Sequence, residues 1–196
     1  MKKKYVILLF IAIVSNLQGQ NSESKIDSIF KKCFEKEIEK RNEDLIDLYG
    51  PKVKDITNDS NLLQLFEKFL IDEKLLLDNN QENYIELFRN IRSNKTQNKI
   101  LEKFLVKFDF DPYEYFYPFL SLHCYGYVER LNLIDVNNWR YQVILEYNYY
   151  EADGKDIDNH LIKSLSLVPK KEFEKIYYRQ LFLNEIYFRL YVRTYK

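Results

Sequence analysis

Residues 176–193 read IYYRQLFLNEIYFRLYVR, and this stretch near the C-terminus decides the fold. Its apolar side chains cover most of a helical surface. Its polar side chains fall on a narrow stripe, formed by Gln180, Asn184, Glu185, Arg189 and Arg193. A helix with so wide an apolar face is covered on more than one side. We therefore expect one helix from Pro169 to about Arg193, packed at the centre of the protein.

The rest of the chain has the same helical character. Glycine and proline number only four each, which is few for the many tight turns of an all-β protein. The sequence therefore predicts an all-α fold with a single domain over residues 20–196, built of stacked antiparallel helical hairpins. Apolar residues recur at helical spacing in further stretches at 24–49, 62–77, 84–91, 100–108, 119–131 and 160–168.

Short local signals mark where these helices begin and end. Residues 50–51 are Gly-Pro, a sharp stop, because glycine suits the position after a helix and proline cannot continue it. Residues 58–61 read NDSN, a loop that ends in capping residues. Residues 111–114 read DPYE, in which the Asp, the Pro and the Glu all suit a first helical turn. Pro118 follows too soon for a straight helix, so we expect a kink or a restart there.

Residues 139–150 carry a conflicting pattern. Apolar or aromatic residues occupy every second position from Trp139 to Tyr149, as they would in a strand. No second alternating run follows to pair with it, and an isolated strand cannot satisfy its backbone hydrogen bonds. We therefore favour a helix over residues 139–150.

Three segments of the chain resemble one another. They cover residues 29–34, 65–70 and 100–105, at offsets of 36 and 35 residues. Periods of this length are typical of stacked helix-hairpin repeats, whose concave faces hold peptides or proteins. The alternative is chance, because amphipathic helices rich in Glu, Lys, Leu and Phe align readily.

The N-terminus has the pattern of a secretory signal peptide. Residues 2–4 are lysines, an apolar run of about ten residues follows, and a more polar stretch ends at Gly19. We expect cleavage near Gly19, which makes residues 1–19 the signal peptide. The first cysteine is Cys33, so no lipid-attachment site lies near the cleavage region. The sequence predicts a periplasmic or secreted protein without a membrane anchor after cleavage.

The charge balance argues against a nucleic-acid partner. The whole chain has 30 basic and 30 acidic residues. Loss of residues 1–19 removes three lysines and no acid, which leaves 27 basic against 30 acidic residues, a net charge of −3. No basic excess then remains to neutralise phosphates.

Cys33 and Cys124 are the only cysteines. An even count in an exported chain suggests a disulfide between them. The alternative is two separate buried thiols, since free cysteine is among the most buried residue types. Spacing alone leaves both readings open.

Residues that could carry catalysis or hold a metal form no strong motif. His123 is a poor base for Cys124, because adjacent residues of a helix point about 100° apart. Asp156, Asp158 and His160 could gather a weak ion, but the glycine at 154 does not fit a calcium loop. A solvated loop that caps the next helix is the simpler interpretation, so we expect no cofactor and no metal.

The aromatic run from residue 113 to 127 is the best candidate binding surface, although core packing is the default role for such residues. Tyrosine combines a large contact area with a polar tip. The candidate binding residues are Tyr113, Tyr115, Tyr117, Tyr125 and Tyr127. We expect an exported, non-catalytic protein that binds a protein or peptide in the cell envelope, in an immunity-, inhibitor- or adaptor-like role. One alternative is a structural subunit of an envelope assembly.

The other alternative is an envelope hydrolase. It would use Asp111, Glu129 or His123 in an aromatic cleft, because sugar-binding clefts combine acids with aromatic side chains. Glu114 could supply a second carboxylate next to Asp111. Both of these acids already suit a capping role, which weakens the enzymatic interpretation.

Overall fold

The computed structural model describes the backbone of residues 2–51, 53, 61–91, 100–108, 110–116, 118–153 and 157–195, and side chains within narrower limits of these ranges. These residues form an all-α domain and contain no strand, which confirms the predicted fold class. The elements are α1 (Lys2–Tyr49), α3 (Leu62–Asp72), α4 (Gln81–Ile91), α5 (Ile100–Leu105), the 3₁₀-helix η2 (Tyr113–Phe116), α6 (Pro118–Arg130), α7 (Trp139–Asp153), α8 (Ile157–Leu167), α9 (Lys170–Phe173) and α10 (Ile176–Tyr195).

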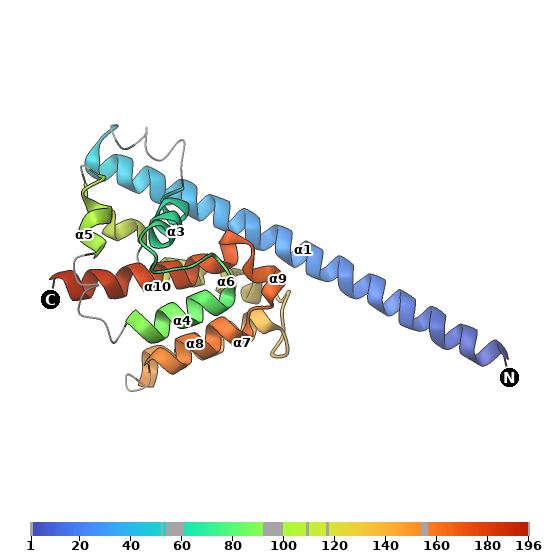
Figure 1. Cartoon of the computed structure of the whole chain (residues 1–196). Helices are drawn as coiled ribbons and strands as arrows, with labels where there is room; N and C mark the ends of the chain where they lie inside the picture. The colour runs from blue at the N-terminus through green and yellow to red at the C-terminus, as the bar shows by residue number, and fades with distance from the viewer. Residues whose placement is uncertain are drawn as a thin grey trace.

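Helix α10 runs through the middle of the packed helices (Figure 1). It contacts α1, α3, α4, α5, α6, α9 and η2. Every side chain from Tyr177 to Tyr187 is buried. The predicted central role of this segment is therefore confirmed. Its polar stripe is covered as well, because Gln180, Asn184 and Glu185 are at most 1% exposed.

The last helix is not continuous, and this corrects the prediction of one helix from Pro169 to Arg193. The helical turns stop at Phe173 and resume at Ile176. The break leaves backbone carbonyls free of helical partners. Arg179 Nη1 donates to two of them, 2.8 Å to the carbonyl oxygen of Phe173 and also to that of Glu174. A side chain inside α10 thus stabilises the interruption before it.

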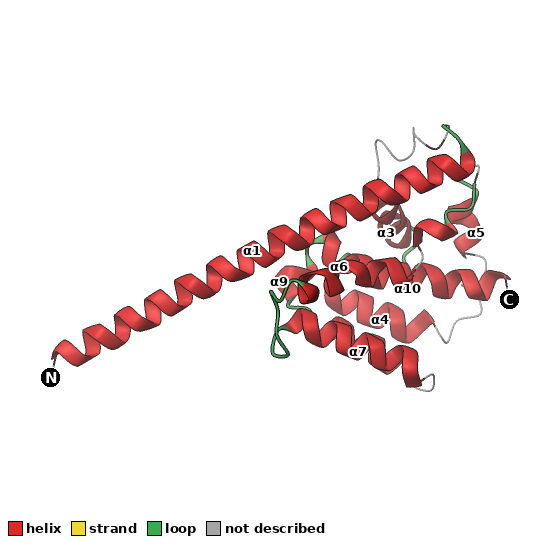
Figure 2. Ribbon diagram, turned by 180° about the vertical axis from the view of Figure 1, so that it is seen from behind, coloured by secondary structure: helices red, strands yellow, loops and turns green. Residues whose placement is uncertain are grey.

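Helix α1 is a single helix that packs across one side of the body, and its N-terminal part extends beyond the other helices (Figures 1 and 2). It ends at Tyr49, as the Gly-Pro stop predicts. Gly50 has φ +84°, a conformation that glycine adopts without the steric penalty of a side chain. Its N–H donates to the carbonyl oxygen of Ile46 at 2.8 Å.

Other helix boundaries agree with the sequence signals in part. Asn61 Oδ1 accepts from the N–H of Leu63 and caps α3, but residues 58–60 lie outside the described part of the chain. Helix α3 ends at Asp72 rather than at residue 77, because Lys74 takes φ +59° and turns the chain. Helix α5 ends at Leu105 rather than at residue 108.

The predicted cap at Asp111 and the predicted helix over residues 139–150 both form. Asp111 Oδ1 accepts from the N–H of Tyr113 at 2.9 Å, so the predicted cap forms, although it begins a single 3₁₀ turn. The chain then restarts as α6 at Pro118, as expected. Residues 139–150 lie within α7, which confirms the helix over the strand.

A disulfide joins Cys33 of α1 to Cys124 of α6, with a Cα–Cα distance of 5.6 Å. The bond confirms the pairing over two separate thiols. Both cysteines are buried, at 8% and 0% exposure. It fixes α1 to the body at the middle of α6.

Within the described residues, no helix is both long and apolar enough to cross a membrane. The proposed repeat stays a prediction. Its three segments lie in the middle of α1, in α3 and at α5.

Candidate functional site

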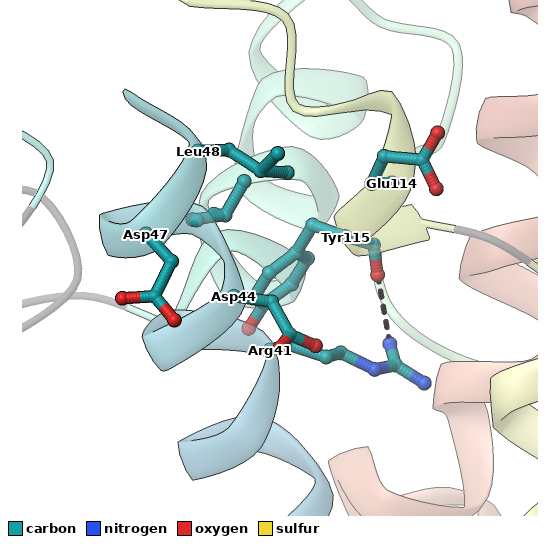
Figure 3. Close-up of a pocket in the computed structure, with 7 residues that line it drawn as sticks. Arg41, Asp44, Asp47, Leu48, Glu114 and Tyr115 are labelled. Atoms are coloured by element: carbon teal, nitrogen blue, oxygen red, sulfur yellow. Dashed lines mark hydrogen bonds between the residues drawn. The ribbon is translucent and has the colours of Figure 1, made fainter. Parts of the chain in front are cut away.

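A hollow of about 600 Å³ lies between the C-terminal turns of α1 and the η2 turn. Its size is in the range of binding pockets for small ligands and side chains. Figure 3 shows carboxylate side chains from both elements around it. The lining residues are Arg41, Asp44, Leu45, Asp47, Leu48, Glu114 and Tyr115.

The two walls of the hollow are held together by hydrogen bonds from α1 to η2. Arg41 Nη1 donates to the carbonyl oxygen of Tyr115 at 2.9 Å (Figure 3). The guanidinium carbon of Arg41 also lies 5.6 Å from the centre of the Tyr115 ring. Tyr49 contributes a second link, because its hydroxyl donates to the carbonyl oxygen of Asp111 at 3.0 Å. The position of η2 therefore depends on the last turns of α1.

Tyr115 connects the hollow to the next helix along the chain. Its side chain is 1% exposed, and its hydroxyl lies 3.1 Å from Oδ1 of Asn61, the cap of α3. Burial raises the pKa of Tyr115 well above its usual value, although the nearby Arg41 lowers it. The phenol is therefore neutral and serves as a rigid wall.

Arg41 is the most unusual side chain of the hollow. It is only 3% exposed, and its Nε and Nη2 atoms have no hydrogen-bond partner. Burial lowers the pKa of its guanidinium, while Tyr115 and Glu37 favour the charged form. Buried donors without acceptors cost about 1–3 kcal/mol each. Both atoms are themselves buried, so they are unsatisfied donors inside the wall of the hollow.

The rim of the hollow has the opposite character. Asp44, Asp47 and Glu114 are all exposed, and no ion pair involves them within the described residues. Leu48 adds an apolar surface that is 61% exposed. Among the described residues that line it there is neither a histidine nor a serine, threonine or cysteine. The arrangement can bind a ligand, and its described residues offer no nucleophile–base pair.

A second, smaller hollow of about 300 Å³ lies beside the disulfide. Its rim includes His123, whose Nε2 lies 3.6 Å from Glu37 Oε1. Tyr127 stacks loosely on His123, with ring centres 6.4 Å apart. The described residues that line it are Ile29, Lys32, Cys33, Lys36, Glu37, His123 and Tyr127.

The structure distributes the tyrosines of the predicted binding surface over different environments. Tyr115 lines the first hollow and Tyr127 the second. Tyr113 lies 4.4 Å from the Tyr191 ring of α10, measured between ring centres. Tyr125 is fully buried, and its hydroxyl donates to the carbonyl oxygen of Tyr178. Tyr117 lies outside the described residues.

The residues of the hydrolase hypothesis have different neighbours. Asp111 Oδ2 accepts from the Tyr191 hydroxyl at 3.0 Å, near the end of α10. His123 faces Glu37 of α1. Glu129 lies on α6 six residues after His123, a spacing that places the two on different faces of the helix.

His160 has a structural partner. Its Nδ1 lies 2.6 Å from Oε1 of Glu146, whose other oxygen accepts from Lys163 at 2.7 Å. Burial disfavours the Glu146 carboxylate, but the bonds from Lys163 and His160 outweigh it and lower its pKa. Asp156 and the side chain of Asp158 lie outside the described part of the chain. Among the described residues, no group of acids, histidines or cysteines is arranged to hold a metal ion.

Four residues of the hollow do not stand out in the sequence as candidate site residues: Arg41, Asp44, Asp47 and Leu48. One signal could have found two of them. The C-terminal end of a helix carries a partial negative charge, which disfavours acidic residues there. Asp44 and Asp47 lie in the last turns of α1, whose last turn contains no basic residue.

No family model, no curated protein and no solved structure matches this chain. The function is therefore inferred from the residues of the site.

Proposed function

We propose that this chain is an exported, non-catalytic protein of the cell envelope that binds a protein or peptide at the hollow between α1 and η2. The observation that carries the proposal is the hollow of about 600 Å³ itself, whose described lining combines exposed carboxylates with the buried side chain of Arg41. Exposed Leu48 at the rim gives a partner an apolar contact. An immunity-, inhibitor- or adaptor-like role fits a site whose described lining residues offer no nucleophile–base pair.

Export is supported by two independent features. Residues 1–19 have the charged start and apolar run of a signal peptide, and cleavage after Gly19 gives a mature chain of residues 20–196. The disulfide between Cys33 and Cys124 is typical of oxidising compartments. We infer a periplasmic or secreted location. Fractionation with mass measurement of the N-terminus tests it, and a full-length chain in the cytosol would contradict it.

The binding function is tested by an affinity pull-down from envelope extract, read by mass spectrometry. The bait is the purified protein, the Leu48→Arg variant, or the control Leu77→Arg. Leu77 is 79% exposed and lies outside the hollow, so both variants add the same charge to a surface leucine. We expect one partner at near-stoichiometric yield with the wild type and with Leu77→Arg.

Leu48→Arg is expected to lose that partner, because the added side chain occupies the rim. Equal recovery with all three baits would place the binding surface elsewhere. Recovery of the chain alone, in a self-associated form, would instead favour a structural subunit of an envelope assembly.

A further inference from the structure

The hollow beside the disulfide gives access to one of the two bonded cysteines. Cys33 is among the residues that line this hollow of about 300 Å³, and it retains 8% of its surface. Cys124 is fully buried and is not among the described lining residues. Thiol–disulfide exchange depends on which sulfur an attacking thiolate can reach. The bond is therefore open to attack at Cys33 and shielded at Cys124.

The charges around this hollow favour an anion. Lys32 and Lys36 lie one helical turn apart on α1, and both are exposed. Neither lysine has an ion-pair partner among the described side chains. The one acid of the described lining is Glu37, whose Oε1 lies 3.6 Å from Nε2 of His123. Two cations against one acid leave a positive surface, and thiolates react fastest in such electropositive surroundings.

The remaining lining sets the size and character of the attacking molecule. The hollow lies at the lower end of the volumes of small-ligand pockets. Ile29 and the rings of His123 and Tyr127 give it an apolar side. A small thiol with a short carbon chain between its sulfur and an anionic group fits this lining. Its sulfur can meet Cys33 while its anionic group lies near the lysines one residue before and three residues after that cysteine.

Helix α1 keeps other attachments on both sides of the disulfide. Before Cys33, the carboxylate of Asp27 accepts from Lys175 Nζ at 2.9 Å. After it, Arg41 Nη1 donates to the carbonyl oxygen of Tyr115 at 2.9 Å. Opening of the bond therefore leaves α1 held on the body, so exchange at Cys33 is compatible with the folded protein.

We propose that Cys33 is a site of reversible S-thiolation by a small anionic thiol. The thiolate attacks Sγ of Cys33 and forms a new S–S bond there. The bond to Cys124 breaks, and its electron pair leaves with Sγ of Cys124, which takes up a proton from water. One disulfide replaces another, so no oxidant is consumed. Attack by Cys124 in the reverse direction releases the thiol and restores the native bond. This chemistry is independent of partner binding at the α1–η2 hollow.

The test identifies which cysteine carries the adduct. The purified, oxidised protein reacts with 2-mercaptoethanesulfonate, a small thiol with an anionic sulfonate. The reaction is quenched with acid at low conversion, and pepsin digestion at low pH with mass spectrometry locates the mixed disulfide. We expect at least about ten times more adduct on Cys33 than on Cys124, because only Cys33 faces the hollow. An equal distribution, or an excess on Cys124, would overturn the proposal.

The same reaction in concentrated urea gives the reference for an unshielded bond. Unfolding exposes both sulfurs, so we expect the preference for Cys33 to disappear. A preference that is the same in urea and in buffer would come from the local sequence and would overturn the role of the hollow. Without urea, no adduct at either cysteine over several hours would show that the folded protein closes both sulfurs, which would also overturn it.

The role of the lysines is tested by a pair of matched double variants. The site variant is Lys32→Gln with Lys36→Gln. The control, Lys68→Gln with Lys171→Gln, removes the same charge from two exposed lysines outside the hollow. We expect the site variant to react with 2-mercaptoethanesulfonate at least about threefold more slowly and the control to react as the wild type does. Equal rates in all three proteins would overturn the assignment of an anionic thiol.

A thiol of opposite charge separates attraction from simple access. Cysteamine carries an ammonium group in place of the sulfonate. We expect it to react with the wild type more slowly than 2-mercaptoethanesulfonate does, after correction for the thiolate fraction of each, and to lose this disadvantage in the site variant. Cysteamine that reacts faster with the wild type would contradict the preference for an anion.

Discussion

Asp27 lies where α1 meets α10, and its carboxylate is surrounded by donors. Lys175 Nζ donates to it at 2.9 Å, and the hydroxyls of Tyr177 and Tyr178 each donate at 3.0 Å. Tyr178 in turn accepts from Arg140, which is fully buried. Burial of Asp27 alone would raise its pKa, but these hydrogen bonds outweigh burial and lower it.

This lowered pKa gives a prediction for stability against pH. A carboxyl group whose pKa is lower in the folded state stabilises the fold above its usual pKa of about 4 and loses that contribution as pH falls through the folded value. We expect Asp27→Asn to lower the free energy of unfolding by about 1.5–3 kcal/mol at pH 7. The difference in free energy of unfolding between the variant and the wild type should narrow as the pH falls from about 5 toward 2. Urea unfolding of both proteins at several pH values measures this difference. A difference that stays constant with pH would contradict the prediction.

Burial of the same network raises the pKa of Tyr177 to about 12, and the hydrogen bond to Asp27 adds to the effect. The hydroxyl therefore remains a donor throughout the neutral range. Arg140 is held on both sides, because it also donates to Glu23 at 2.8 Å and lies 4.3 Å from the centre of the Trp139 ring. At the scale of single residues, the hydroxyls of Tyr177 and Tyr178 at the start of α10 are buried partners of Asp27 in α1, and Tyr178 is also a partner of Arg140 in α7.

Helix α1 is the element whose attachment is easiest to test. The disulfide to α6 closes a loop across a sequence separation of 91 residues. In the chain-entropy model, a bond of this span stabilises the fold by about 4–5 kcal/mol. We expect the Cys33→Ala, Cys124→Ala double variant to lose up to this amount in urea unfolding. Thiol titration of the denatured wild type should find no free thiol before reduction, and two free thiols would contradict the bond.

Substitution of two glycines, one at the end of α1 and one inside α6, is expected to have opposite effects on stability. Gly50 ends α1 at φ +84°, and a Cβ there meets no atom within 4 Å, so Gly50→Ala tests backbone conformation alone. We expect it to cost about 1–2 kcal/mol. Gly126 lies inside α6, where a Cβ would lie 3.4 Å from the flexible Arg130 Nη1. Gly126→Ala should stabilise by about 0.5–1 kcal/mol. The same sign for both variants would contradict this account.

The sequence predicts elements better than it predicts their ends. The apolar period of residues 176–193 is strong enough to identify the central helix. The break before it depends on Arg179, which also donates to Glu67, 112 residues away. A contact of this range has no local signature. The early end of α3 at Asp72 likewise depends on the left-handed conformation of Lys74, a residue type that seldom adopts it.

The candidate site was less predictable than the fold for a related reason. An aromatic run draws attention to residues 113–127, but only tertiary packing decides which rings become core. Tyr125 is covered by α10, whereas Tyr115 forms the wall of a hollow whose other side is α1. Arg41 and Tyr115 are 74 residues apart. The unfavourable acids at the end of α1 were the one local signal of this site.

At the scale of the whole molecule, α1 divides into two parts with different roles. Its N-terminal part extends beyond the packed helices (Figure 1), whereas Glu23 and Asp27 bind Arg140 and Lys175 in the body. Removal of residues 1–19 leaves both carboxylates in place. We therefore expect the chain of residues 20–196 to fold, and its disulfide to form, as in the full chain.

A longer truncation tests the part of α1 that binds the body. The chain of residues 28–196 lacks Glu23 and Asp27, so the buried guanidinium of Arg140 loses its carboxylate partner and Lys175 loses one of two. Removal of one partner from a buried charge is more costly than loss of an exposed pair. We expect the free energy of unfolding to fall by about 2–4 kcal/mol relative to residues 20–196, measured by urea unfolding of both chains.

Restoration of the stability by Arg140→Met in the shorter chain would identify the unpaired charge as the cause. Equal stability of the two truncations would instead show that the body is held without this end of α1, and the disulfide at Cys33 would then be its main attachment.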